Sequence, residues 1–510
     1  MSLEGLADAV LLPGFAGTTA PDWVRRRVAG GLGGVVLFAR NCVSAPQVAA
    51  LTAALRAERD GVVVGTDEEG GDVTRLDAAV GSPVPGAYAL GVVDDVGLTR
   101  AVSAAVADRL AAAGVTLNLA PVADVNSAAD NPVIGVRSFG ATTDLVARHV
   151  VAAVAGTQAA GVAACAKHFP GHGDTTVDSH VGLPTVRSLD VAPFRAAVGA
   201  GVASVMTGHL VVPGYGSRPA TLNPALVTGL LRESLGFRGA VVSDALEMGA
   251  VAGTVGLAEG AVLAVLAGVD ALCLGGDEAG EPIADAARDA LVAAVRSGRL
   301  PEERLAEAAA RTATLGRSPT QGPTAGPTAG RTAGGAAVPS AGAAAGPAAG
   351  AGPAAGTGPA AGTGPAAGAG GDLVGLGLAA ARRAIRVVGD VRVGPAPVLV
   401  ELDPAPTVAV GRTAWGLAGL LPGATERRLG PDDPVPPLPA RPVVVVARDA
   451  TRVGWVGRAV AALLAARPDA VVVEMGLPGP PPAARGWLAT GGASRAGALA
   501  AAELLTGAGR

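Results

Sequence analysis

The sequence contains few aromatic residues, few charged residues and very little cysteine. Phe, Trp and Tyr make up 2% of the 510 residues, so the chain offers no extended row of rings on which a polymer could stack. Charged residues make up 16%, with 39 Lys and Arg against 43 Asp and Glu and a formal net charge of -4. The absence of a basic block gives no support to a nucleic-acid or anionic-membrane surface. The composition therefore favours a small partner of little charge.

The three cysteines, Cys42, Cys165 and Cys273, are odd in number and far apart. Small secreted domains instead carry dense, even sets of cysteines that form disulfides, so we expect reduced and buried thiols here. The first residues include Glu4 and Asp8, where a secretory signal would carry basic residues. No uninterrupted apolar stretch is long enough to cross a bilayer. The sequence therefore predicts a cytoplasmic protein without a membrane span.

A shift in composition divides the chain into two folded parts. At 510 residues the chain exceeds what one compact core usually holds. Residues 317–371 consist almost entirely of Gly, Pro, Ala, Thr and Ser, and 346–369 repeats GPAAG followed by Ala or Thr. Such a segment cannot bury a core. We predict a disordered linker between a catalytic domain at 1–316 and a smaller domain at 372–510, and expect the two domains to move independently.

The first domain alternates short apolar runs with alanine-rich helical stretches. The apolar runs are nearly continuous and rich in β-branched residues, which is typical of parallel strands covered on both faces. Eight such units in this length fit a (β/α)8 barrel. The alternative is an open doubly wound sheet, which needs a glycine-rich turn after the first strand, and LLPGFAGTT is a poor version of that turn. The predicted strands are 9–12, 34–38, 62–66, 116–120, 162–167, 204–207, 240–243 and 271–274.

The second domain has its own pattern of elements, which predicts a small αβα layer domain with a parallel sheet. Its middle part reads as a βαβ unit. Arg448, Asp449 and Arg452 follow a predicted strand, and we expect them in a solvated loop rather than at an interface with the first domain. The predicted elements are helices 376–387, 455–466 and 493–505 and strands 398–402, 443–447 and 470–475.

Polar residues gather just after five of the predicted barrel strands. These stretches read GTDEEGG, LNLAPVADVN, AKHFPGHGDTTVDSH, MTGHL and VVSDALEM. Four of the five histidines lie between His168 and His209. Because active sites of such barrels lie at the carboxyl ends of the strands, the pattern predicts a catalytic or binding site there.

The segment 167–180 concentrates titratable side chains, and a metal site is the first interpretation of it. His168 and His172 have the spacing of ligands on one helical face, but the proline and glycine between them prevent a helix. His172, Asp174 and His180 also lack the tight HxHxDH pattern of binuclear hydrolases. We therefore disfavour a metal site.

Two other interpretations of this segment stay open. A loop held by hydrogen bonds to its own backbone suits His172 and Asp174 best. Asp178 and His180 are two positions apart, so both side chains of an extended backbone project from the same side and can hydrogen-bond. The carboxylate would orient the ring and favour the imidazolium. This pair is a candidate general acid/base.

The sequence KHFPGHGDTTVDSH, from Lys167 to His180, resembles the signature loop of the glycoside hydrolase family 3 β-N-acetylhexosaminidases, the NagZ-like enzymes of cell-wall recycling. Further similar motifs follow in the order of that family and cover most of the first 315 residues. They are LFARN at 37–41, TDEEGGDVTRL at 66–76, NPVIGVRSFG at 131–140, MTGHL at 206–210 and GFRGAVVSDALEM at 236–248.

The resemblance implies a role for each candidate residue and requires no cofactor or metal. Asp244 is similar to the family nucleophile, and His180 paired with Asp178 to its acid/base dyad. His209 ends the sixth predicted strand and either contacts substrate or only completes the wall. The residues implied to hold the hydroxyls and the N-acetyl group of one sugar are Asp67, Arg75, Arg137, Lys167 and His168.

Structural alternatives apply to some of these residues. Asp244 could instead cap a helix that begins near Leu246, because aspartate is common at such positions. Arg137 and Lys167 could simply pair with Asp67 or Asp124.

The sequence also departs from the family at two positions. Ala245 stands where the family usually has an acidic residue, and Asp72 where it often has arginine. The first change removes a side chain next to the implied nucleophile, so it bears on the hydrogen bonds around Asp244 more than on the chemistry.

A retaining glycosidase needs a nucleophile and a proton donor on opposite faces of the anomeric carbon. Asp244 and His180 supply such a pair, because an imidazole can donate to the leaving oxygen and then deprotonate water. We predict a retaining exo-β-N-acetylglucosaminidase that removes terminal β-linked GlcNAc in peptidoglycan recycling. A phosphorylase or β-glucosidase of the same family, a non-catalytic sugar-binding module and a metallohydrolase are the alternatives. The aglycone and the oligomeric state stay open.

Overall fold

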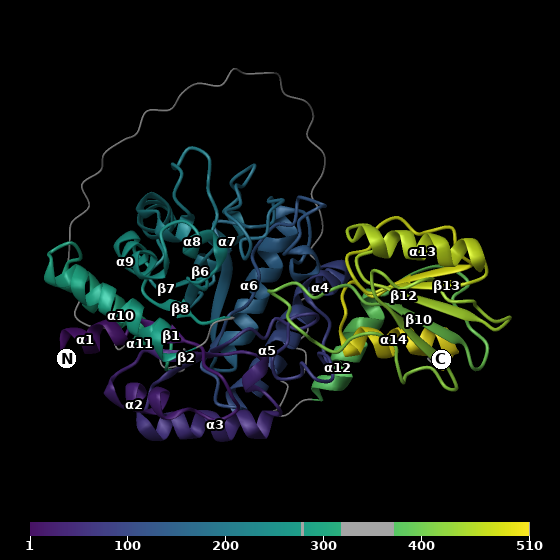
Figure 1. Ribbon diagram of the computed structural model, residues 1–510, viewed down its shortest axis with the longest axis horizontal. Coiled ribbons are helices and arrows are strands. Elements are labelled where there is room, and N and C mark those ends of the chain that lie inside the picture. Colours follow the sequence, from purple (N-terminus) through teal and green to yellow (C-terminus); the bar gives the residue numbers. More distant parts are fainter. Residues whose placement is uncertain (277–279, 318–371, 509–510) are drawn as a thin grey trace, which may run out of the picture.

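The computed structural model describes residues 1–276, 280–317 and 372–508, which form two domains (Figure 1). Residues 1–317 build the larger domain, and residues 372–508 build the smaller one at the green to yellow end of the colour scale. The predicted linker lies outside the described residues, except for Arg317.

The larger domain is the predicted (β/α)8 barrel. β2 to β7 pair in parallel and in sequence order, while β8 pairs in parallel with β1 and is joined to β7 by a bridge between Val242 and Ala271. β1 packs beside β2 and completes the ring. Each of the eight predicted strands overlaps one observed strand. The strands are β1 Leu11–Pro13, β2 Gly34–Leu37, β3 Val63–Thr66, β4 Leu117–Asn118, β5 Ala163–Phe169, β6 Ser204–Thr207, β7 Ala240–Ser243 and β8 Leu272–Leu274.

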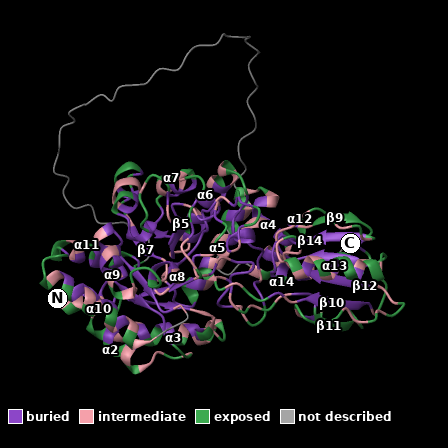
Figure 2. Cartoon of the chain, turned by 45° about the horizontal axis from the view of Figure 1, so that its top comes forward, coloured by how far each residue is buried: buried purple, intermediate pink, exposed green. Residues whose placement is uncertain are grey.

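Alternate strand residues face the barrel interior and the surrounding helices, which explains the continuous apolar runs. Val36 and Val63 join a buried cluster with side chains from the other strands. Their neighbours Val35 and Val64 join the larger cluster under the helices. Both faces are therefore buried, as Figure 2 shows for the strands of the barrel. The surrounding helices are α1 Leu3–Asp8, α2 Asp22–Gly30, α3 Ala45–Glu58, α4 Ala87–Val93, α5 Val96–Ala112, α6 Thr143–Ala159, α7 Ala192–Gly199, the helix Ala225–Ser234, α8 Gly249–Ala252, α9 Leu257–Ala267, α10 Glu281–Arg296 and α11 Glu302–Thr314.

The smaller domain is a six-stranded sheet between helices, in the order β11-β10-β12-β13-β14-β9. The pairs are parallel except for β9, which runs antiparallel to β14. α13 (Gly454–Ala466) covers one face of the sheet and α14 (Arg495–Thr506) the other, and α12 (Leu373–Ala384) packs against α14. This is the predicted αβα arrangement. The strands are β9 Arg386–Gly389, β10 Val398–Leu402, β11 Thr425–Leu429, β12 Val443–Ala447, β13 Val471–Glu474 and β14 Gly486–Ala489.

Three strands of this sheet were not predicted. The predicted helix 376–387 ends at Ala384, and the residues after it pair with β14 as the edge strand β9. The β-branched Val387 and Val388 favour a strand there, although their side chains are exposed. The sequence of β11, TERRL, is polar because this strand forms the other edge of the sheet. β14 was missed because its sequence, GWLA, contains no β-branched residue.

The two domains contact each other directly. Arg448 pairs with Asp72 of the barrel domain, and Arg452 donates to the carbonyl oxygen of Asn131 at 2.5 Å. The side chains of Arg448 and Arg452 are only 12% and 16% exposed, so the prediction of a solvated loop was wrong for both. α12 also packs on α4 and α5. The expectation that the domains move independently does not agree with this packed interface.

The described residues also place the three cysteines. All three are free thiols, with Cys165 and Cys273 buried and Cys42 only half-buried. Burial raises the pKa of Cys165 to about 12. Among the helices of residues 1–276, 280–317 and 372–508, none is both long and apolar enough to cross a membrane.

Candidate active site

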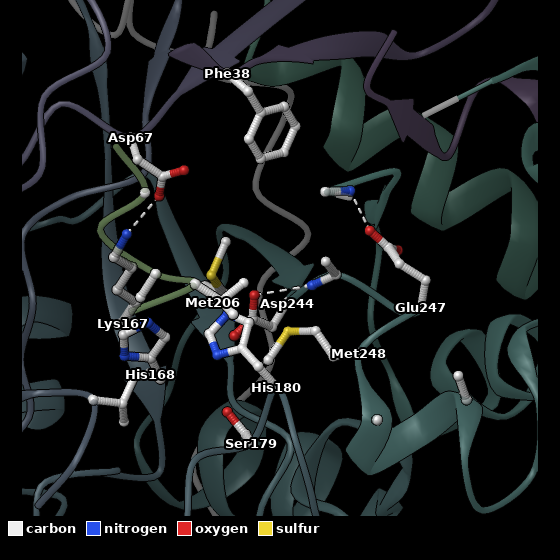
Figure 3. Close-up of a pocket in the computed structure, with 18 of the residues that line it drawn as sticks. Phe38, Asp67, Lys167, His168, Ser179, His180, Met206, Asp244, Glu247 and Met248 are labelled. Carbon is white, nitrogen blue, oxygen red and sulfur yellow. Dashed lines mark hydrogen bonds and ion pairs between the residues drawn. The ribbon is translucent and has the colours of Figure 1, made fainter. Parts of the chain in front are cut away.

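A cavity of about 730 Å³ opens where the barrel strands end, and Figure 3 shows the side chains that surround it. Asp67 follows β3, Lys167 and His168 lie at the end of β5, and Asp244 follows β7. The parallel strands bring these residues together from positions far apart in the chain, as the sequence analysis expects for a barrel. The predicted residues that line the cavity are Asp67, Arg75, Arg137, Lys167, His168, His180 and Asp244.

Asp244 lies in the cavity wall with its carboxylate held by the backbone. The N–H of Ala245 donates to its Oδ1 at 2.9 Å. Burial would raise the pKa of Asp244, but nearby histidine side chains and this amide outweigh burial and lower the pKa to about 2. The next helix, α8, begins only at Gly249, so Asp244 does not cap it. The side chain is thus an ionised carboxylate at neutral pH, as a nucleophile requires.

Asp178 and His180 form a hydrogen-bonded pair at the edge of the same cavity. Nδ1 of His180 lies 2.6 Å from Oδ1 of Asp178, which also accepts from the backbone N–H of His180 at 2.9 Å. Because a carboxylate only accepts, Nδ1 carries the proton and Nε2 is left for the cavity. Burial would lower the pKa of His180, but the Asp178 hydrogen bond and the charge of Asp244 outweigh burial and raise it. The pair can therefore supply a proton near neutral pH.

A buried ionic network forms the opposite part of the wall. Nζ of Lys167 lies 2.7 Å from Asp67 and 2.8 Å from Glu69, and Arg137 binds both carboxylate oxygens of Glu69 at 2.7 and 3.0 Å. Burial would raise the pKa of Asp67, but Lys167 and Arg75 outweigh burial and lower it. The structural alternative for Arg137 and Lys167 was a pair with Asp67 or Asp124. Lys167 does pair with Asp67, whereas Arg137 pairs with Glu69. The ionised side chains of this network can bind hydroxyl and carbonyl groups.

His168 is fixed by a carboxylate behind it. Its Nδ1 lies 2.7 Å from Asp124, which also accepts from the backbone N–H groups of His168 and His172 at 3.1 and 2.7 Å. The carboxylate places the proton on Nδ1, and Nε2 lies 3.5 Å from a nitrogen of Arg137. Asp124 was considered only as a partner for Arg137 or Lys167, so its contact with His168 was not predicted.

Two further histidines hold the structure together. His209 is fully buried and bonds Thr221 through Nδ1 at 2.8 Å and the carbonyl oxygen of Ala245 through Nε2 at 2.9 Å. It is not among the residues that line the cavity, and its two hydrogen bonds agree with the structural one of its two predicted roles. His172 bonds the side-chain hydroxyls of Thr175 and Ser179 within its own loop, rather than the loop backbone that was expected, and burial lowers its pKa to about 4.

The described residues include no group of three or more His, Cys, Asp or Glu side chains arranged to hold a metal ion.

The barrel domain is the part of the chain that matches a known family. The profile of the "Glycosyl hydrolase family 3 N terminal domain" matches residues 20–315. The chain belongs to glycoside hydrolase family 3.

Several proteins are similar to this family 3 chain. A β-hexosaminidase from Xylella fastidiosa strain M23 is 39% identical over 265 residues, which cover 49% of this chain and 78% of that protein. Beta-hexosaminidase A from Pseudoalteromonas piscicida is 34% identical over 269 residues, but the match spans only 45% of that protein and 47% of this chain.

Solved structures cover more of the chain. A family 3 β-N-acetylglucosaminidase from Paenibacillus sp. str. FPU-7 matches with a TM-score of 0.80 and 31% identity, over 99% of this chain and 97% of that one. NagZ from Neisseria gonorrhoeae, in complex with N-trifluoroacetyl-D-glucosamine, matches with a TM-score of 0.50 and 29% identity, over 60% of this chain and 98% of that one.

The structure accounts for both departures from the family 3 pattern. At position 245 the contacts to its neighbours come from the backbone: the N–H holds Asp244 and the carbonyl oxygen accepts from His209. An acidic side chain is therefore not needed to hold the Asp244 carboxylate. Asp72 points away from the cavity to the smaller domain, where it pairs with Arg448 and accepts from the N–H of Ala493 at 2.7 Å.

The sequence analysis missed the part of the wall that comes from the smaller domain. Val408, Ala409 and Gly411 line the cavity beside Arg75. In the sequence, the rest of the barrel domain separates them from Arg75. No local pattern marks such a contact. Other missed wall residues include Phe38, which stands in the motif LFARN, and Glu247 and Met248, which end the motif GFRGAVVSDALEM.

Proposed function

We propose that this protein is a retaining exo-β-N-acetylglucosaminidase that hydrolyses terminal β-linked GlcNAc. The observation that carries the proposal is that a carboxylate suited to act as a nucleophile and an imidazole suited to donate a proton line one cavity. The pKa of Asp244 is lowered to about 2, and the hydrogen bond to Asp178 raises the pKa of His180. The names of the relatives from Xylella fastidiosa and Paenibacillus support the class of sugar.

In the first step Asp244 attacks the anomeric carbon of the terminal sugar. A bond forms between a carboxylate oxygen and that carbon while the bond to the leaving oxygen breaks. Nε2 of His180 gives its proton to the leaving oxygen, so the aglycone departs as a neutral alcohol. The negative charge of Asp178 stabilises the imidazolium before the transfer and keeps the ring in position afterwards.

In the second step water displaces Asp244 from the sugar. The now neutral His180 accepts a proton from the water, whose oxygen bonds to the anomeric carbon as the ester bond to Asp244 breaks. Two displacements restore the β configuration and return both side chains to their starting states. One histidine serves as acid and then as base, because an imidazole can carry or release its proton near neutral pH.

Asp67, Lys167 and Arg137 line the cavity and support recognition of a single sugar, while Glu69, which does not line it, pairs with both cations. Carboxylates accept from ring hydroxyls, and the cations donate to hydroxyls or to the carbonyl oxygen of an N-acetyl group. Of the described aromatic residues, only Phe38 lines the cavity, which suits one terminal unit better than a stacked chain. We propose a muropeptide of peptidoglycan recycling as the natural substrate. The cytoplasmic location stays a prediction.

The test compares aryl β-GlcNAc with aryl β-glucoside, each with and without phosphate, on the wild type and on Asp244→Ala. We expect turnover of the GlcNAc substrate, little turnover of the glucoside and no need for phosphate. Dependence on phosphate would identify a phosphorylase instead. Preference for the glucoside would identify a β-glucosidase, and a wild type without turnover would favour a sugar-binding module.

A further inference from the structure

We propose that the smaller domain is part of the sugar-binding pocket, because its docked segment 408–411 fixes Arg75 for sugar binding. The proposal rests on the proposed function in one respect, namely that this cavity binds the sugar. It goes further by giving the second domain a specific role and by assigning Asp72 and Arg448 as the positioning residues that keep it docked.

Arg75 connects the two domains at the cavity wall. Its two terminal nitrogens donate to the carbonyl oxygens of Val410 and Ala409, at 2.8 and 3.0 Å, and one of them lies 3.7 Å from the carboxylate of Asp67. The Arg75 side chain is only 8% exposed. Both acceptors belong to the smaller domain, so the barrel alone could not make these hydrogen bonds. They hold the guanidinium toward Asp67.

Segment 408–411 is also a surface of the cavity. Val408, Ala409 and Gly411 line it beside Arg75, and Figure 1 shows a light green loop of the smaller domain reaching over the barrel. These residues present small side chains and backbone, so they shape the wall without adding a reactive group. Loss of docking would open this side of the cavity to water and release Arg75 to other conformations.

Asp72 anchors the docked domain three residues before Arg75. One carboxylate oxygen pairs with Arg448 and the other accepts from the N–H of Ala493. The guanidinium of Arg448 also lies 5.8 Å from the ring centre of Trp415, a distance that allows a cation–π contact. Asp72 is buried and pairs with Arg448, so an arginine at this position would bring two like charges together. The aspartate therefore suits a chain with this second domain.

The test measures KM and kcat for aryl β-GlcNAc with the full chain. The variants are Arg448→Gln and Asp72→Asn, each of which removes one charge of the anchor. The control is Arg383→Gln, which removes another ion pair between the domains, with Asp95 at 2.9 Å, where both side chains are exposed. We expect KM to rise about tenfold in both anchor variants with kcat changed less than about threefold, and neither constant to change in the control.

A double variant shows whether Arg75 transmits the effect. Arg75→Lys keeps the charge but cannot donate to both carbonyl oxygens and face Asp67 at once. If the anchor acts through Arg75, adding Arg448→Gln to Arg75→Lys raises KM much less than Arg448→Gln does alone. Additive effects, or an unchanged KM in Arg448→Gln, would overturn the proposal.

Hydrogen exchange separates this proposal from the proposed function. Arg448→Gln should speed amide exchange in residues 70–76 and 404–413, whereas Arg383→Gln should leave both segments unchanged. Absence of turnover of aryl β-GlcNAc by the wild type would contradict the proposed function. Amide exchange would still decide whether the anchor holds these two segments. Equal exchange in Arg448→Gln and wild type would contradict the docking role.

Discussion

Oδ1 of Asp178 accepts a hydrogen bond from Nδ1 of His180 across 2.6 Å, and this contact orients a ring that lines the cavity. It also raises the pKa of His180 above its usual value. The rate of a reaction that needs the protonated ring falls as the pH rises through that pKa.

Asp178→Asn should therefore move the alkaline limb of the pH profile to lower pH. The amide cannot stabilise the imidazolium as the carboxylate does, so the pKa of His180 falls and the acid form is lost earlier. The profile of kcat/KM on a β-GlcNAc disaccharide measures this, because that substrate needs the proton. Asp174→Asn is the control, since Asp174 lies in the same loop but bonds Ser188. An unmoved alkaline limb in Asp178→Asn would separate the pair from the acid role.

His180→Ala should discriminate between leaving groups. An activated aryl group leaves without a proton, so its kcat/KM should fall less than about tenfold, while that of a disaccharide should fall by about 10²–10⁴. The variant also lacks the base for the second step, so a burst of aryl release followed by slow turnover is expected. Equal losses for both substrates would remove His180 from the acid role.

Glu69→Gln should lower stability as well as sugar binding. Glu69 is a buried partner of both Lys167 and Arg137, and removal of one member of such a group leaves the others uncompensated. We expect the free energy of unfolding to fall by about 3 kcal/mol, measured by urea denaturation. Glu58→Gln breaks an exposed pair with Arg25 and should cost less than about 1 kcal/mol. Similar losses in the two variants would contradict the importance of the buried network.

The barrel could be predicted from sequence because each strand is buried on both faces. Val35 and Val36 face opposite sides of the sheet and are both apolar, so local composition alone marks the strand. The strand ends then place Asp67, Lys167 and Asp244 on one face. The pairing of Asp178 with His180 was also predicted, but from an extended backbone. The chain instead turns here, since the carbonyl oxygen of Asp178 accepts from the N–H of Val181 and its Oδ1 from the N–H of His180.

Contacts between distant segments could not be predicted in this way. Arg75 and Val410 meet only because the smaller domain docks on the barrel. The local sequence around either residue does not indicate the contact. The edge strand β11 was missed because its exposed polar side chains lack the apolar pattern of the central strands. His209 sits at a strand end like the cavity residues, but its side chain bonds Ala245 and Thr221 behind the wall.

The most direct test of the account is to trap the sugar on the enzyme. A 5-fluoro derivative of GlcNAc with fluoride as leaving group forms the ester quickly but hydrolyses slowly, so a retaining enzyme accumulates the covalent intermediate. Mass spectrometry of the digested protein should find the sugar on the peptide that carries Asp244, and Asp244→Ala should acquire none. A label on another residue, or rapid turnover of the reagent by Asp244→Ala, would contradict the assignment of Asp244 as the nucleophile.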